Sequence, residues 1–416
     1  MASWRAAIIP GALVAVVALA AWLATPARGP RAETVVTRNV DFYVMIDTSP
    51  SMSIPATSRG IASLEAATQL NEKGCAFACH ERVPDDLEPF RMSSGAPINC
   101  ATNGAYADGT TFNADSKFPY AGRDNYDLAR CLGATLRIDL VRGAVQDLIG
   151  TAERSAKAGA GAYRMALFET NVSDGNVANE VSIYTADPMD QLDACGRRSK
   201  EFDVYKLQSL TDDLAPTGSA FTSAGNISAM EVYDNNHQLS GHQNCNMDTN
   251  LDADITRMNG LIPAAGNGAS GPGNTPQEVL FIVTDAFNDP APDRAFGPMD
   301  WDGSRCNAIK NRGIRIAVLY TTYYSQLLAA PRHLVDEPDF TEWSPKLPKG
   351  LPRDLPPSTP IGSDPMALAA QQCASPGLYS QVDTDGDVSA AMQALFKHVV
   401  QTAGGNAAPA DLGKSD

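Results

Sequence analysis

The fold class of this chain is decided by the stretch Val40-Asp41-Phe42-Tyr43-Val44-Met45-Ile46 and by the residues that follow it directly, Asp47-Thr48-Ser49-Pro50-Ser51. The first stretch is rich in β-branched and aromatic residues, which predicts a buried strand that stops at a polar turn. Asp47 then lies at the carboxyl end of a strand, where open α/β sheets bind their ligands. The sequence thus predicts a strand that carries a candidate site at its tip.

Further along the chain, helical and strand patterns alternate. Strand character recurs at residues 163–168, 278–284 and 313–320, and the second of these strands ends at Asp285. The helical stretches are residues 137–158 and 305–312, and the C-terminal part is predicted as helix 366–373, edge strand 377–382 and closing helix 388–400. This alternation predicts an α/β fold with a mostly parallel, doubly wound sheet that helices cover on both faces.

The predicted organisation is one α/β domain with two insertions. The domain spans residues 39–403, with a cysteine-containing insertion at 74–130 and a proline-rich loop at 331–360. Residues 1–5, 25–38 and 404–416 are predicted to be an N-terminal flank, a linker and a disordered tail.

Residues 6–24 form a nearly continuous apolar run, which predicts export. The residues that follow offer no good cleavage site, and this favours an uncleaved, single-pass membrane anchor over a secreted product. We expect an inner-membrane protein whose main domain faces the periplasm or the exterior. Lys and Arg total 32 against 48 Asp and Glu, a formal charge of −16, and no basic cluster points to nucleic acid as a partner.

The chain contains an even number of cysteines behind this export segment, which predicts a disulfide framework in an oxidising compartment. We expect Cys306 and Cys373 to pair across neighbouring elements, and the remaining pairings stay open. The eight candidates are Cys75, Cys79, Cys100, Cys131, Cys195, Cys245, Cys306 and Cys373.

The pattern Asp-x-Ser-x-Ser brings one carboxylate and two hydroxyls, from Asp47, Ser49 and Ser51, onto one tight loop. Oxygen ligands of this kind suit Mg²⁺, Mn²⁺ or Ca²⁺, and such an ion could accept a carboxylate from a partner protein. Asp285 is expected to reach the same edge of the sheet and to hold the ion directly or through water. The simpler alternative is that these side chains only cap a turn and the following helix.

The loop after the first strand and the Thr-Asp after a later strand resemble the von Willebrand factor type A (vWA) family, where they are the first and third segments of the metal-ion-dependent adhesion site. Three other stretches resemble the vWA domains of TadG-like proteins of tight-adherence (Flp) pilus assembly. They are Gly74-Cys75-Ala76-Phe77-Ala78-Cys79-His80, Cys306 to Ile314, and Gln372 to Gly377. The resemblance implies a pilus assembly or adhesion factor that binds a pilus component, a secretion-machinery component or a surface ligand.

One departure from the family concerns the second metal segment, a Gly-x-Thr in the family. The matching stretch here is Thr217-Gly218-Ser219-Ala220-Phe221-Thr222, in which Ala220 takes the place of the threonine ligand. Ser219 or Thr222 would have to supply that hydroxyl. Metal binding is therefore less firmly predicted than the fold, and a structural vWA protein that binds its partner without metal is the alternative.

Other motifs lead to weaker hypotheses. An aspartate-nucleophile phosphatase would need a second carboxylate at position 49, which is Ser49, so we expect no enzyme activity. Cys75 to His80 is one residue too long for a c-type haem attachment motif and is better explained by disulfide cysteines. Asp383-Thr384-Asp385-Gly386-Asp387 does not match the EF-hand template and is predicted to be a turn.

Overall fold

The computed structural model describes residues 38–68, 129, 132–170, 205–227, 250–269, 275–288, 297–322 and 364–403. All of them belong to one compact unit, residues 36–416. The predicted anchor, nearly all of the 74–130 insertion, the proline-rich loop, the C-terminal tail and the cysteines other than Cys306 and Cys373 lie outside the described residues. Among the residues described, no helix combines the length and the apolar character needed to cross a bilayer.

Six strands form a single sheet in the order β3-β2-β1-β4-β7-β8. Every neighbouring pair is parallel except β2 and β3, which run antiparallel. The bounds are β1 Arg38–Ile46, β2 Gly161–Glu169, β3 Tyr205–Thr211, β4 Gln277–Thr284, β7 Arg315–Thr321 and β8 Tyr379–Val382. The sheet confirms the predicted mostly parallel α/β class, and β8 is an edge strand as expected.

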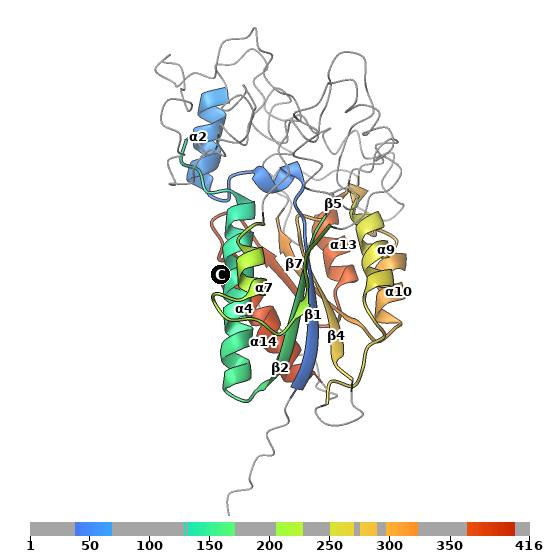
Figure 1. The fold of residues 1–416 in the computed structure, drawn as a ribbon. Coiled ribbons are helices and arrows are strands. Elements are labelled where there is room, and N and C mark those ends of the chain that lie inside the picture. Colours follow the sequence, from blue (N-terminus) through green and yellow to red (C-terminus); the bar gives the residue numbers. More distant parts are fainter. Residues whose placement is uncertain are drawn as a thin grey trace, which may run out of the picture. The chain divides into compact units, whose positions relative to one another are not determined.

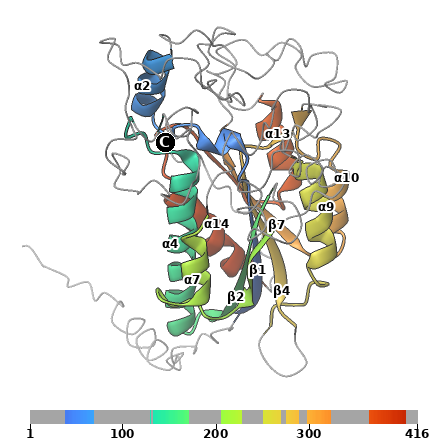
Figure 2. The same ribbon diagram turned by 45° about the horizontal axis from the view of Figure 1, so that its top comes forward.

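Helices cover both faces of this sheet, as Figures 1 and 2 show. One face carries α4 (Arg137–Lys157), α7 (Ser219–Ala224) and α14 (Val388–Thr402), and the other carries α9 (Leu251–Leu261), α10 (Ser304–Lys310) and α13 (Pro365–Cys373). Because side chains alternate along a strand, β1 contributes Phe42 and Val44 to the first core and Tyr43 and Met45 to the second.

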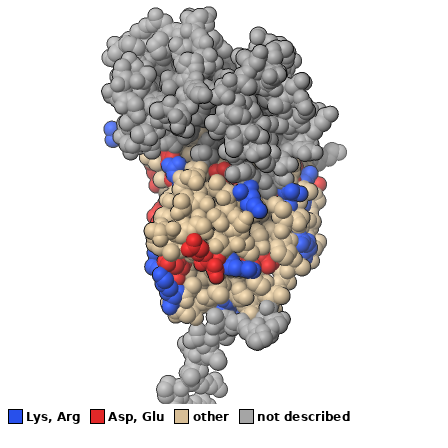
Figure 3. Space-filling model, in the orientation of Figure 1, with Lys and Arg blue, Asp and Glu red and all other residues tan. Residues whose placement is uncertain are grey.

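Shorter elements lie at the ends of the strands. The 3-10 helix η1 (Pro50–Ser53) follows the Asp47 loop, α2 (Ser58–Thr68) comes next, and β5 (Phe287–Asn288) pairs with β6 (Gly297–Pro298) just after β4. On the face seen in Figure 3, basic and acidic side chains of the described residues occur side by side.

Two predictions about individual residues are confirmed. Cys306 of α10 and Cys373 of α13 form a disulfide, with their Cα atoms 5.1 Å apart. The segment from Asp383 to Asp387 is a turn: Asp387 caps α14 by accepting a hydrogen bond from the Ala390 amide, and Asp385 accepts from the Ser58 amide at the start of α2.

Candidate functional site

The candidate site lies at the carboxyl edge of the sheet, between its two central strands. Asp47 follows β1 directly and Asp285 follows β4 directly, and these strands are parallel neighbours in which Ile46 pairs with Val283. The Asp47 amide continues the ladder by donating to the Val283 carbonyl at 2.8 Å. When the six strands of this sheet are counted from 1 to 6 in the order of the chain, with β7 and β8 as the fifth and sixth, they lie in the order 3-2-1-4-5-6. The direction of winding therefore reverses between β1 and β4. Ligands of doubly wound folds bind at this reversal point.

Asp47 is fully buried, and its carboxylate is held by several hydrogen bonds. Oδ2 accepts from the Thr284 hydroxyl at 2.6 Å, and Oδ1 accepts from the Ser49 amide at 3.0 Å and from the Thr170 hydroxyl at 3.5 Å. Thr48 fastens the same loop to the end of β2, because its amide and its hydroxyl both bond to Thr170. The carboxylate is therefore fixed in orientation although it lies away from water.

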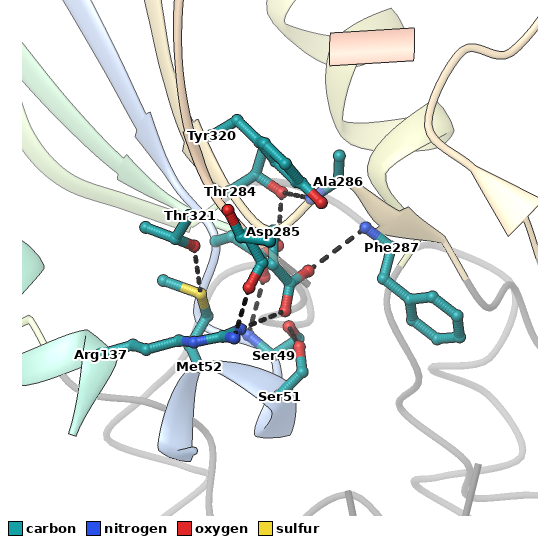
Figure 4. A network of polar contacts seen from close by, with 12 residues as sticks. Ser49, Ser51, Met52, Arg137, Thr284, Asp285, Ala286, Phe287, Tyr320 and Thr321 are labelled. Carbon is teal, nitrogen blue, oxygen red and sulfur yellow. Dashed lines mark hydrogen bonds and ion pairs between the residues drawn. The ribbon is translucent and has the colours of Figure 1, made fainter. Parts of the chain in front are cut away.

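The two loop serines link Asp47 to Asp285. The Ser49 and Ser51 hydroxyls lie 2.9 Å apart, and both side chains are buried. The Ser51 side chain acts to lower the pKa of the Asp285 carboxyl, and Asp285 Oδ1 accepts a hydrogen bond from the Phe287 amide at 3.2 Å. Figure 4 shows Ser49, just before η1, and Ser51, within η1, below Asp285. Four oxygen-bearing side chains predicted from the sequence, Asp47, Ser49, Ser51 and Asp285, thus lie together.

Two carboxylates buried side by side disfavour their own ionisation. Burial, and next the negative charge of Asp47, raise the pKa of the Asp285 carboxyl to about 7, against the lowering effect of Arg137. Burial also raises the pKa of Asp47, and its hydrogen bonds with Thr284 and Ser49 act in the opposite direction. A cation between the two groups would stabilise both charges.

Arg137, the first residue of α4, was not predicted as a site residue, yet its side chain reaches this group. One guanidinium nitrogen lies 3.5 Å from Asp285 Oδ2, and another donates to the Thr322 carbonyl at 2.5 Å. Both members of the ion pair are buried, and Figure 4 shows the guanidinium directed at Asp285. No spacing rule in the sequence connects these positions, because 148 residues separate them.

The backbone after Asp285 adopts an unusual conformation. Ala286 has φ 61°, in the left-handed region that residues with a Cβ rarely adopt. Its amide donates to the Thr284 hydroxyl at 2.8 Å, so this hydroxyl accepts from the strained residue while it donates to Asp47. Strain of this kind collects at functional sites, where the surrounding structure enforces it.

The chemistry of these side chains fits a hard divalent cation. Two carboxylates and two hydroxyls offer oxygen ligands, and among the described residues one arginine, Arg137, reaches them. Among the described residues, buried oxygens without a hydrogen-bond partner include Ser53 Oγ at the end of η1 and Asn288 Oδ1 at the end of β5. When bound, an ion of this kind would supply an electrophilic coordination position for an oxygen ligand from outside the protein.

The structure does not bring Ser219 or Thr222 to this group. Both lie on α7, where Gln146 of α4 donates to the Phe221 carbonyl at 3.5 Å. Gln146 is nine residues beyond Arg137, about 14 Å along the helix axis. The Ser219 and Thr222 side chains are exposed beside the middle of α4, and Ala220 is packed in the core. The described residues therefore place no threonine of this segment at the site.

Comparison with known proteins gives little beyond this geometry. No family model and no curated protein matches the chain. Two solved structures of the pilus adhesin SpaC from Lactobacillus rhamnosus GG align with 88% of this chain at 10% and 9% identity, with TM-scores of 0.38 and 0.39. Proximal thread matrix protein 1 from the mussel byssus aligns with 86% at 7% identity and a TM-score of 0.33.

The chain spans 30%, 31% and 48% of the lengths of those three structures. At TM-scores this low, none of the three assigns a family or an activity. The chemistry of the site therefore has to be argued from its own residues.

Proposed function

We propose that this chain is a non-enzymatic vWA-type binding protein that engages a protein partner through a divalent cation at the Asp47 loop. The observation that carries the proposal is the convergence of Asp47, Ser49, Ser51 and Asp285 at the reversal point between β1 and β4. All four side chains are buried, and two of them are carboxylic acids. The cation would be Mg²⁺ or Mn²⁺, or Ca²⁺, and the partner would contribute a carboxylate.

Export and anchoring through residues 6–24 form the second part of the proposal, with the binding domain facing the periplasm or the exterior. The resemblance to TadG-like proteins supports a place in Flp pilus assembly or in adhesion. A reporter enzyme that is active only outside the cytoplasm, fused after residue 416, tests the orientation. Activity of the fusion, together with its recovery in the membrane fraction, is the expected result, and an inactive fusion contradicts it.

Calorimetric titration of Mn²⁺ and Mg²⁺ into the purified full-length chain tests the metal site. Wild type is expected to show saturable heat and a rise in Tm, both lost in D47N and strongly reduced in S51A, which keeps both carboxylates. D212N removes one exposed carboxylate outside the site and is the matched control, with wild-type behaviour expected. Equal titration curves for wild type and D47N would refute the metal site.

A metal-independent vWA protein is the second candidate, and Arg137 favours it. The guanidinium already gives Asp285 a positive partner, and the threonine of the second family segment is missing. Under this alternative the same titrations show no saturable heat, and partner binding survives in a chelator.

A further inference from the structure

Arg137 is held in place by more than its side chain. Its amide donates to the Ile54 carbonyl at 3.0 Å, and the preceding Leu136 forms a bridge with Pro55. The start of α4 is thus fastened to the segment that follows η1. The guanidinium leaves this fixed point and crosses the carboxyl edge of the sheet to Asp285, after β4, and to Thr322, after β7.

The contact of Arg137 with Asp285 is long for a buried ion pair. At 3.5 Å it exceeds the separation of about 2.7–2.9 Å of a strong charge-assisted hydrogen bond. The same chain builds a tighter pair elsewhere: Arg164 approaches Asp41 with two nitrogens, one of them Nε at 2.8 Å from Oδ1. A shorter bond of Arg137, at 2.5 Å, goes to the neutral carbonyl of Thr322. Arg137 therefore offsets the charge of Asp285 without forming a short, two-nitrogen ion pair with it.

We propose that Arg137 is a tethered cation that compensates Asp285 in the metal-free protein and yields this carboxylate to a divalent ion. The inference rests on the proposed metal site. It adds a residue that sets the affinity of the site and that couples metal binding to the start of α4 and the end of β7.

Two cations compete for one buried carboxylate in this arrangement. A divalent ion held by Asp285 would lie within a few ångströms of the guanidinium, where like charges repel strongly because little water screens them. Arg137 would then release Asp285 while it keeps its bond to the Thr322 carbonyl. The cost of this exchange weakens metal binding, so a neutral residue at position 137 is expected to strengthen it.

The test compares wild type, R137Q and R137K as full-length chains. In a chelator, R137Q leaves a buried carboxylate uncompensated, and its Tm should fall by about 5 °C or more. With Mn²⁺, R137Q should bind at least about tenfold more tightly than wild type and gain more in Tm. R137K keeps the positive charge and is the matched control, with an affinity close to that of wild type.

R137Q with wild-type or weaker Mn²⁺ affinity overturns the inference and leaves the metal site standing. Absence of Mn²⁺ binding in every variant overturns the metal site itself, so the two failures are distinguishable. If R137Q does not fold in chelator, the double variant R137Q/D285N, which removes both charges, tests whether Arg137 compensates Asp285. Recovery of a folded state with a near wild-type Tm supports charge compensation by Arg137, and a double variant as unstable as R137Q overturns it.

Discussion

Replacement of Thr284 by valine isolates the hydroxyl that connects Asp47 to the strained backbone. Valine keeps the shape and the burial of the side chain, because only the hydroxyl becomes a methyl group. Two bonds are lost: the 2.6 Å bond donated to Asp47 Oδ2 and the 2.8 Å bond accepted from the Ala286 amide. A hydrogen bond to a charged group contributes about 1.5–3 kcal/mol, and an unsatisfied buried amide costs about 1–3 kcal/mol. We expect T284V to lower the free energy of unfolding by about 3–5 kcal/mol.

Thr321 provides the matched control, because it ends the neighbouring parallel strand β7 and is equally buried. Its hydroxyl donates to the Met52 sulfur at 3.8 Å, a weak bond. T321V should therefore cost less than about 1 kcal/mol. Urea unfolding of the full-length chain in chelator measures both variants. A loss in T284V no larger than that in T321V would refute the view that Thr284 organises the site.

The pKa of Glu278 and the disulfide give two further predictions. Burial and the nearby charge of Asp41 raise the pKa of Glu278 to about 7, so its folded form binds the proton more tightly than the unfolded chain does. The folded state is therefore not destabilised by Glu278 at acid pH, and it is destabilised increasingly as pH rises toward 7 and Glu278 ionises. We expect E278Q to have a higher Tm than wild type at pH 8 and the same Tm at pH 4. A Tm difference that does not change with pH contradicts this prediction. The Cys306–Cys373 disulfide joins residues 67 apart in the sequence, and chain entropy predicts that its removal lowers the free energy of unfolding by about 4 kcal/mol. In urea unfolding, the free energy of unfolding should fall by similar amounts in C306A, in C373A and in the double variant. If the loss in the double variant equals the sum of the two single losses, each cysteine acts through its own packing and the prediction is wrong.

The central strands could be predicted because their residues are buried on both faces. Six of the seven residues from Val40 to Ile46, all except Asp41, and the run from Val279 to Val283 carry apolar or aromatic side chains, and these side chains lie on both faces of the sheet. Helix α4 was also predictable, since Ile138, Val141 and Val145 recur along one buried side. Because the carboxyl ends of parallel strands lie at one edge of a sheet, the placement of Asp47 and Asp285 at the same edge could be predicted, although the order of the strands was not.

Other elements left weaker signals in the sequence. β3 is an antiparallel edge strand whose side chains are largely half-exposed, and its residues lack the apolar run of the central strands. α9 was not predicted, although it shows helical spacing at Leu251, Ile255 and Met258, Asn250 as its cap and two acidic residues in its first turn, which favour a helix start. The contact of Arg137 with Asp285 depends on how far α4 extends over the sheet edge, which no local pattern encodes.

The position of β1 has a mechanical consequence. This strand joins the N-terminal segment to the Asp47 loop, so in a chain anchored through residues 6–24 a pull on a captured partner would run along its axis. β1 is about 30 Å long, since nine residues rise by about 3.3 Å each. It is hydrogen-bonded to β2 along its full length on one side and to β4 from Val40 to Ile46 on the other. Such a load would shear both ladders at once instead of opening them one bond at a time, and it would be shared across the centre of the sheet.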